Sequence, residues 1–218
     1  MATSERTQLR RHPERGSRAS ADVHAALDAA FLAHVGYSVE GQPFVVPTLF
    51  GRRGDTLYLH GSAASRTLRA LERGVPACVT VTLVDGLVLA RSAFNHSMNY
   101  RSVMAFGTAR AIAEAAAKAD ALRVISEHLM QGRWEAVRAP SERELKATTV
   151  LEFAIDEASA KVRRGPPIDE DEDYALPIWA GVLPLATVAG APEADPRLAP
   201  GLATPEHVRR WTAEGRRR

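Results

Sequence analysis

Small polar residues gather at residues 57–71 (LYLHGSAASRTLRAL), where an alternating, strand-like run gives way to a helical pattern. Gly61 allows a ligand to approach the backbone closely, and the hydroxyls of Ser62 and Ser65 can donate hydrogen bonds. Arg66 carries a planar guanidinium that matches phosphate oxygens, and the start of a helix also stabilises an anion. The junction therefore predicts a phosphate site, although a capped surface helix with Ser62 as its N-cap explains the local pattern equally well.

An apolar strand precedes this junction. Residues 44–50 (FVVPTLF) offer an edge against which a flat ring can lie. Together the two stretches predict a nucleotide site, with the ring on the strands and the phosphate at the helix start. His60 lies at the junction, and a histidine in such a place is more often packed or hydrogen-bonded than catalytic.

A second group of polar residues lies within residues 94–109 (FNHSMNYRSVMAFGTA), at the entry to another strand. Its hydrogen-bonding side chains are those of His96, Ser97, Asn99, Tyr100, Arg101 and Ser102. Such groups are costly to bury without partners. The segment is therefore either an exposed loop or a place where a polar ligand satisfies them.

The strand pattern predicts a mainly β protein with flanking helices, built as an antiparallel barrel. Strands are expected at 42–50, 55–60, 76–94, 100–112 and 148–163. The first two should pair as a hairpin through residues 51–54, and the run at 76–94 should fold back on itself at Asp85 and Gly86. Gly107 indicates a bulge or a close backbone contact.

Helical periodicity complements these strands. Helices are expected at 21–35, directly after residue 60, and at 114–130. The short middle helix should turn Leu68 and Leu71 inward and end at Gly74. Thr204 and Pro205 predict the start of a further short helix near the end of the chain.

Composition bounds the class of protein. The 218 residues are 45% hydrophobic and 25% charged, which is typical of a globular domain. Cys78 is the one cysteine and cannot form an internal disulfide, so a cytoplasmic location is expected. The sequence shows no apolar run long enough to span a bilayer, no signal-peptide pattern and no metal-ligand motif.

The formal charge of +2 hides an uneven distribution, because arginines cluster at the two ends of the chain. A nucleic-acid reader needs such charge on a folded face, whereas these arginines lie in segments that look like tails. We therefore expect a disordered basic tail at residues 1–19, a barrel domain at 20–190, and a Pro- and Arg-rich tail at 191–218 that can end in a short helix. We expect neither a nucleic-acid nor a membrane partner.

Four segments, in order, resemble the pyridoxamine 5′-phosphate oxidase-related proteins of the FMN-binding split-barrel family, in particular the small flavin-nucleotide-binding branch. They are PFVVPTLFGRRGDTLYLHGSAASRTLRAL, SMNYRSVMAFGTA, SAKVRRG and PIWAGVLPL. The resemblance runs from about Asp22 to Leu185. It implies a six-stranded antiparallel split β-barrel and a homodimer with FMN at the subunit interface.

The resemblance also implies roles for particular residues. Val46, Pro47 and Thr48 would line the isoalloxazine ring. The phosphate would be held by His60, Gly61, Ser62, Ser65 and Arg66. Further polar contacts would come from Asn99, Arg101 and Ser102, and the last contacts, in part from the partner subunit, from Lys161 and Trp179. For Lys161 a solvated strand position, and for Trp179 a core or interface position, are the alternatives.

In function, the resemblance implies an FMN-dependent oxidoreductase that passes hydride or electrons from a donor such as NAD(P)H to a small acceptor. A non-catalytic flavin carrier or sensor is the alternative. Haem or a deazaflavin could replace FMN, with His60, His96 or His128 as haem ligands. Because the sequence shows no arginine pair for a second phosphate, oxidation of pyridoxamine phosphate itself is not expected.

Overall fold

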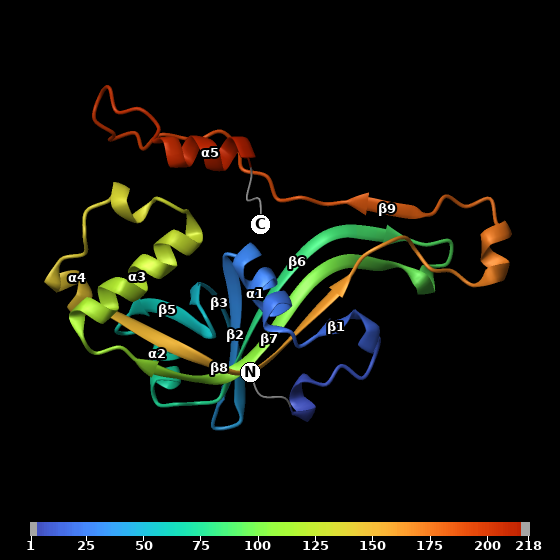
Figure 1. Cartoon of the computed structure of the whole chain (residues 1–218), viewed down its shortest axis with the longest axis horizontal. Coiled ribbons are helices and arrows are strands. Elements are labelled where there is room, and N and C mark those ends of the chain that lie inside the picture. The colour runs from blue at the N-terminus through green and yellow to red at the C-terminus, as the bar shows by residue number, and fades with distance from the viewer. Residues whose placement is uncertain (1–3, 215–218) are drawn as a thin grey trace.

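Long antiparallel strands dominate the computed structural model, which describes residues 4–214. The strands are β1 Gly16–Ser17, β2 Leu32–Val39, β3 Gln42–Leu49, β4 Gly51–Arg53, β5 Thr56–Ser62, β6 Ala77–Leu89, β7 Ser97–Ala111, β8 Thr148–Arg163 and β9 Gly181–Pro184. The helices are α1 Ser20–Ala29, α2 Arg66–Glu72, α3 Ala115–Leu129, α4 Glu142–Ala147 and α5 Glu206–Glu214. Figure 1 shows the helices placed around one strongly curved sheet.

The described strands form one sheet in the order β3-β2-β6-β7-β8-β5-β4, with β1 added to β8 and β9 added to β6. β3 and β5 approach each other, so the sheet curls into a barrel that is open along this line. The predicted class, a mainly β split barrel, is therefore confirmed. The expected six strands correspond to the long ones, and the described chain adds the short strands β1, β4 and β9.

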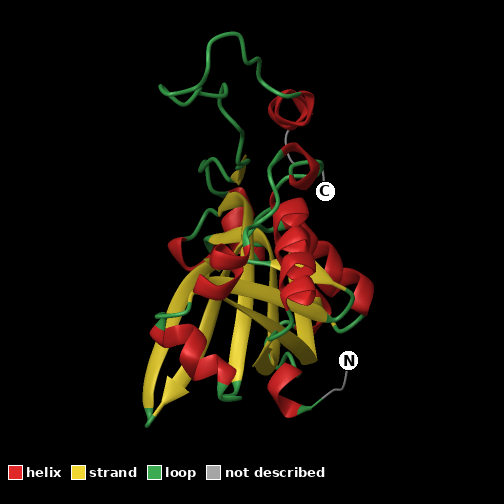
Figure 2. Cartoon of the chain, turned by 90° about the vertical axis from the view of Figure 1, so that its left-hand side faces the viewer, coloured by secondary structure: helices red, strands yellow, loops and turns green. Residues whose placement is uncertain are grey.

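The barrel interior is filled by alternate residues of the long strands, as the period of two requires. Val35, Leu59, Val81 and Phe153 are at most 1% exposed and belong to one continuous core. Helix α1 packs against β6, β7 and β8, while α3 packs against β4 and β5. Figure 2 shows red helices packed beside the yellow sheet.

The prediction of a helix at 21–35 is wrong in its second half. The helix ends at Ala29, and β2 begins at Leu32. From there buried and exposed side chains alternate, with Ala33 and Val35 in the core, because β2 pairs with both β3 and β6. The strand pairing outweighs the helical preference of the alanines.

Both predicted hairpins are wrong. β3 pairs with β2, and β4, at residues 51–53, pairs with β5. The run at 76–94 does not fold back, because β6 continues through Asp85 and Gly86 as one strand between β7 and β9. Asp85 and Gly86 mark an irregularity in the pairing with β7 rather than a turn. The β2–β3 turn uses Glu40 and Gly41, both with positive φ.

Other local predictions are confirmed. Helix α2 buries Leu68 and Leu71, and Gly74 follows it with a φ of +79°. The pairing of β7 with β8 shifts register between Phe106 and Gly107. A Cβ at Gly107 would lie 1.9 Å from the Ala154 carbonyl oxygen, which explains the glycine.

The N-terminal segment differs from the expected disordered tail, whereas the C-terminal segment contains the expected short helix, α5. In the N-terminal segment Thr7 is buried, Arg6 pairs with Glu157, and β1 pairs with β8. Residues 164–200 form an extended arm that leaves the barrel and returns along β6 through β9 (Figure 1). Predicted tail residues 1–3 and 215–218 lie outside the described residues. Within the described part of the chain, no helix is both long and apolar enough to cross a membrane.

Candidate functional site

The open line of the barrel, between β3 and β5, holds a cavity of about 130 Å³ that we call the seam cavity. Seven of the residues expected to bind a cofactor line it together: Val46, Pro47, Thr48, His60, Gly61, Ser62 and Ser65. Leu59, Thr67, Leu68 and Leu71 also line it and were not among the predicted residues. The volume suits a phosphate-sized group but lies below the roughly 300–1,000 Å³ of a typical ligand pocket. A larger ligand would therefore extend beyond it.

Unpaired strand edges border the seam cavity. In the described sheet β3 pairs with β2 alone, and the end of β5 beyond Tyr58 pairs with β8 alone. Backbone N–H and C=O groups on such edges can hydrogen-bond a ligand in the way they would bond another strand. The cavity therefore combines backbone groups from two strands with the hydroxyls of Ser62 and Ser65.

The loop from β5 to α2 is held by its own serines. Ser62 Oγ accepts from Ala64 N (3.2 Å), and Ser65 Oγ, as the N-cap, accepts from Leu68 N (3.4 Å). A Cβ on Gly61 would lie 3.0 Å from Leu68 Cδ1, so this position leaves little room for a side chain. Because α2 has only seven residues and its cap is internal, any anion site here depends on hydroxyl and guanidinium donors more than on a helix dipole.

Arg66 lies beside the seam cavity rather than in its wall. Its guanidinium carbon is 4.8 Å from the centre of the Phe44 ring, which in turn stacks on Tyr37 at 5.3 Å. It lines an adjoining cavity of about 370 Å³ together with Phe44 and Arg73. In the described part of the chain Arg66 forms no salt bridge, so its charge is available to an anion at the seam.

His60 separates the seam cavity from a second cavity of about 500 Å³, which we call the α3 pocket. The α3 pocket is lined by Leu49, His60, Leu122, Ile125, Ser126, Leu129, Trp134, Arg138, Pro140 and Glu144. His60 Nδ1 is buried and has no hydrogen-bond partner. Burial lowers the pKa of His60, so its imidazole is neutral at neutral pH.

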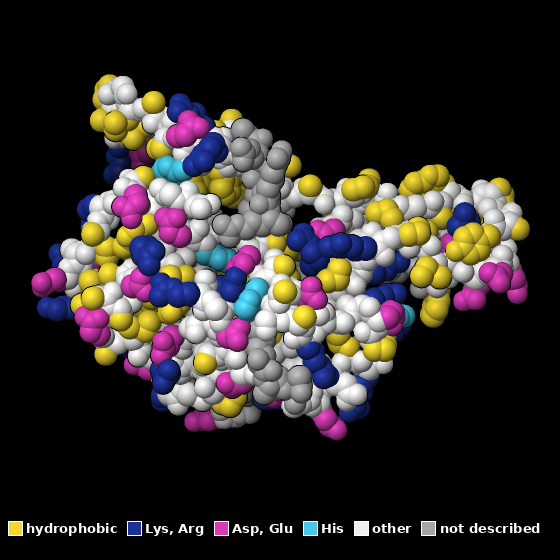
Figure 3. Space-filling model, in the orientation of Figure 1, with side chains coloured by type: hydrophobic (Ala, Val, Ile, Leu, Met, Phe, Trp, Pro, Cys, Tyr) yellow, Lys and Arg dark blue, Asp and Glu magenta, His cyan; other side chains and the backbone are white. Residues whose placement is uncertain are grey.

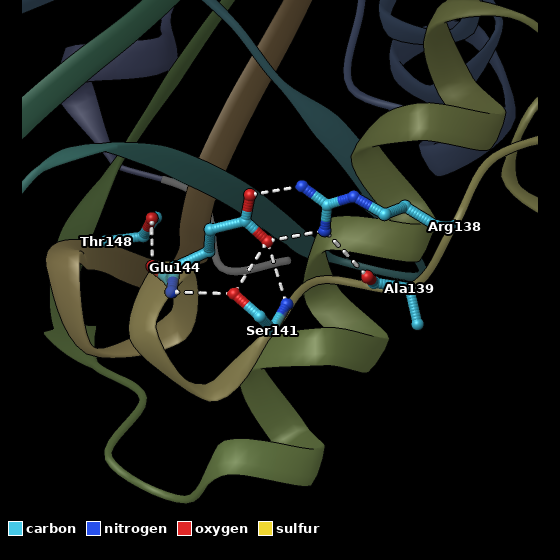
Figure 4. A network of polar contacts seen from close by, with 5 residues as sticks. All are labelled: Arg138, Ala139, Ser141, Glu144 and Thr148. Atoms are coloured by element: carbon cyan, nitrogen blue, oxygen red, sulfur yellow. Dashed lines mark hydrogen bonds and ion pairs between the residues drawn. The ribbon is translucent and has the colours of Figure 1, made fainter.

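A polar network forms the rim of the α3 pocket (Figure 4). Arg138 binds both carboxylate oxygens of Glu144, at 2.6 and 2.7 Å. Ser141, the N-cap of α4, donates to Glu144 from its backbone N–H (2.8 Å) and its hydroxyl (3.0 Å). The Arg138 guanidinium, and after it Ser141, hold the pKa of Glu144 far below its usual range. The network fixes the Arg138–Glu144 ion pair at the mouth of a largely apolar pocket.

The remaining predicted binding residues do not line the seam cavity. Arg101 donates to both oxygens of Asp85, at 2.7 and 3.0 Å, and Asn99 is buried against Arg163 and the Gly165 carbonyl. Arg101 instead lines a cavity of about 750 Å³ beneath the arm, formed by residues 29–32, 82–85, 185–189 and Trp211.

Ser102 and Lys161 are paired neighbours on β7 and β8. Because side chains alternate along a strand, Ser102 points to the opposite face from Arg101. Lys161 Nζ donates to the Arg11 carbonyl at 3.2 Å, and Trp179 on the arm is 70% exposed. Within one chain, these residues and the seam cavity are therefore separate features.

The other two histidines considered as haem ligands already have partners. His128 Nε2 donates to the Ala30 carbonyl at 2.7 Å, and its ring packs 4.6 Å from that of Phe50. His96 Nδ1 accepts from Ala90 N at 3.2 Å in an exposed loop. Neither lines the seam cavity or the α3 pocket.

The sequence did not reveal the α3 pocket. Leu122, Ile125 and Leu129 show helical periodicity, but the same spacing is expected of any helix that packs on a core. Trp134 begins a single 3-10 turn, Trp134–Ala136, and Arg138 lies in the loop after it. Only the packing of α3 against β4 and β5 brings these side chains opposite His60.

Comparison with known proteins places the chain in a family. The family model described as pyridoxamine 5′-phosphate oxidase matches residues 19–162. The chain belongs to the pyridoxamine 5′-phosphate oxidase family. The family resemblance expected from the four segments is thereby confirmed. A search among curated proteins gave no match.

Two solved structures of this family's fold are similar over nearly their whole length. One is the flavocytochrome Anf3 from Azotobacter vinelandii, with 47% identity and a TM-score of 0.89, covering 95% of this chain and 96% of that one. The other is the FAD and haem binding protein from Mycobacterium smegmatis, with 43% identity and a TM-score of 0.87, covering 91% of this chain and 97% of that one.

Proposed function

We propose that this protein is a redox flavoprotein whose flavin phosphate binds at the seam cavity, with the ring extending along the open edges of β3 and β5. The observation that carries the proposal is the convergence of seven predicted cofactor residues on one cavity. A flavin phosphate is an anion, and the hydroxyls of Ser62 and Ser65 with the guanidinium of Arg66 supply charge-assisted and neutral donors. The relatives' flavin content supports the same assignment.

We infer FMN, or the FMN half of FAD, as the bound unit. Both molecules contain the same ring, ribityl chain and first phosphate, so the seam donors serve either one. The Mycobacterium smegmatis relative binds FAD, which favours the longer molecule. The adjoining cavity beside Arg66, with its stacked Tyr37 and Phe44, offers aromatic surface next to the phosphate position.

The proposed activity is oxidoreduction, with NAD(P)H as a candidate donor and a small molecule as acceptor. A bound flavin supplies hydride and single-electron transfer, while the protein binds, orients and tunes it. Donors near the ring would stabilise the charge of the reduced state. The β3 and β5 edges provide backbone N–H groups for this role.

We also propose a homodimer in which the two subunits share the flavin site. The outer face of β6 and β7 exposes Val84, Leu87, Met98 and Met104, each at least 40% accessible. The arm exposes more apolar side chains, among them Trp179, and Figure 3 shows yellow side chains gathered along it. Exposed apolar surface of this extent typically marks an interface. A partner could then bring its own arm to the seam of the first chain.

Haem is a second candidate cofactor alongside the flavin. The specific observation in its favour is that both similar proteins carry haem or are flavocytochromes, at more than 40% identity over nearly the full chain. We therefore propose that this chain binds haem as well as flavin. The buried, unpartnered Nδ1 of His60 beside an apolar cavity fits an iron-binding imidazole.

The first test is an absorption spectrum of the purified protein, repeated on the supernatant after heat denaturation. Twin flavin bands with fluorescence released on denaturation support the flavin, and chromatography of the released molecule separates FMN from FAD. A sharp Soret band reports haem. Light scattering tests the dimer, and NADH and NADPH are then compared as reductants. A colourless protein that binds neither added flavin nor hemin would refute the proposed function.

A further inference from the structure

His60 and His207 are the two histidines in the described part of the chain that bury a ring nitrogen without a hydrogen bond. A buried polar atom without a partner is unusual and calls for an explanation, such as strain, a catalytic role, a water or an ion. His207 packs against Gly132 and lines neither the seam cavity nor the α3 pocket, whereas His60 lines both.

Strand alternation directs His60 toward the α3 pocket. Leu57 and Leu59 on β5 are at most 1% exposed and point into the barrel core. Tyr58 and His60 must then point to the other side of the strand. Helix α3 lies on that side, held so closely that a Cβ at Gly51 would lie 2.7 Å from the backbone of Ile125.

The α3 pocket has the character of a haem site. Its walls are mainly apolar, with Leu49, Leu122, Ile125 and Trp134 among them, and its volume of about 500 Å³ falls within the roughly 300–1,000 Å³ of cofactor pockets. Its rim carries Arg138, which forms an ion pair with Glu144, and Ser141 in turn donates to Glu144 (Figure 4). A haem needs an apolar slot, an axial ligand and a cation near its carboxylates, and this pocket contains all three.

We propose that His60 is the axial ligand of a haem in the α3 pocket, with Arg138 at the rim pairing with a haem carboxylate. This inference rests on the proposed binding of haem and assigns its site. Iron binds the neutral imidazole, and burial keeps His60 in that form. His60 also borders the seam cavity, so a haem here would lie on one side of β5 and the flavin phosphate on the other. His60 is then a haem ligand rather than a donor to the flavin phosphate.

The test uses the full-length chain, purified and then titrated with hemin and, separately, with flavin. His60→Ala is compared with wild type and with His34→Ala, a matched variant of an exposed β2 histidine outside the pocket. Removing a ligand's supporting groups alone typically costs 10–100-fold in metal affinity, so loss of the axial ligand should weaken hemin binding by about 100-fold or more. Added imidazole should restore part of the wild-type Soret spectrum in His60→Ala by occupying the vacated space.

A second variant distinguishes loss of the haem site from a general folding defect. Ser126→Trp places a large side chain in the α3 pocket from α3 and leaves the His60 residue itself unchanged. It should abolish hemin binding while flavin binding and the circular dichroism spectrum stay as in wild type. His34→Ala should retain both cofactors.

The outcomes separate the two proposals. If wild type takes up flavin but shows no Soret band with hemin, the proposed haem binding fails and this site fails with it. If wild type binds haem and His60→Ala gives the same spectrum and affinity, haem binding stands and the His60 assignment is overturned. If His60→Ala loses flavin and keeps haem, His60 is a phosphate donor instead. Loss of haem with retention of flavin supports the inference.

Discussion

Replacing Arg66 with alanine should weaken flavin binding far more than it weakens folding. In the structure Arg66 is exposed, makes no salt bridge with the described residues, and contacts the Phe44 ring at 4.8 Å. An exposed cation–π contact contributes about 0.5–1 kcal/mol, which is the expected loss in unfolding free energy. The folded protein should therefore remain intact.

The expected loss in binding is larger. A hydrogen bond to a charged group contributes about 1.5–3 kcal/mol. Since each 1.4 kcal/mol corresponds to a tenfold change in affinity, the Kd for the flavin should rise roughly 10- to 150-fold. Arg66→Lys keeps the charge but loses the fork, so its Kd should fall between those of wild type and Arg66→Ala.

The assay is a flavin fluorescence titration of the apoprotein, paired with urea unfolding of each variant. Arg110→Ala is the control, because Arg110 is an exposed arginine on β7 that lines none of the cavities described above. Arg110→Ala should bind flavin like wild type. Equal Kd values for wild type and Arg66→Ala would refute the assignment of the phosphate to the seam, and an equal loss in both variants would indicate general electrostatics instead.

Three further predictions concern stability. Gly107→Ala should cost about 3 kcal/mol or more in urea unfolding, because its Cβ would meet the Ala154 carbonyl oxygen at 1.9 Å; a smaller loss would show that the bulge yields. Phe153→Ala should cost about 3–5 kcal/mol, because Phe153 is fully buried in the barrel core. Glu144→Gln should lower the melting temperature at pH 7. The pKa of Glu144 is lower in the folded state than its ordinary value of 4.5. Its contribution to the free energy of unfolding is therefore present above pH 4.5 and is lost as the pH falls from there through the lowered pKa. The difference in melting temperature between wild type and Glu144→Gln should close in acid. A gap that is independent of pH in calorimetry would contradict this reading.

Sequence patterns predicted correctly those features that depend only on neighbouring residues. Gly74 after α2 and the glycine-marked bulge at Gly107 were both predicted, because each depends on a backbone feature that only glycine fits. The polar residues of the β5–α2 junction were recognised for the same reason. Their types and spacing define donors whatever the rest of the chain does.

Pairing between strands was not predictable in this way. Asp85 and Gly86 have the residue types of a tight turn, yet β6 continues through them with a shift in register, because β7 and β9 bond to it on both sides and Arg101 binds the Asp85 carboxylate. The alanine-rich segment before β2 likewise has a local preference, in this case for a longer helix, that the structure does not follow. In both places long-range hydrogen bonding outweighs a local preference.

The sequence by itself determined the family, the mainly β class and the group of residues around Ser62 and Arg66 that can hold an anion. Tertiary structure alone decided which of these residues share a cavity, because the seam arises only where β3 and β5 meet at the ends of the curled sheet. It also decided that His60 faces α3. A strand fixes the alternation of its side chains, but the layer packed against each face depends on contacts between residues far apart in the chain.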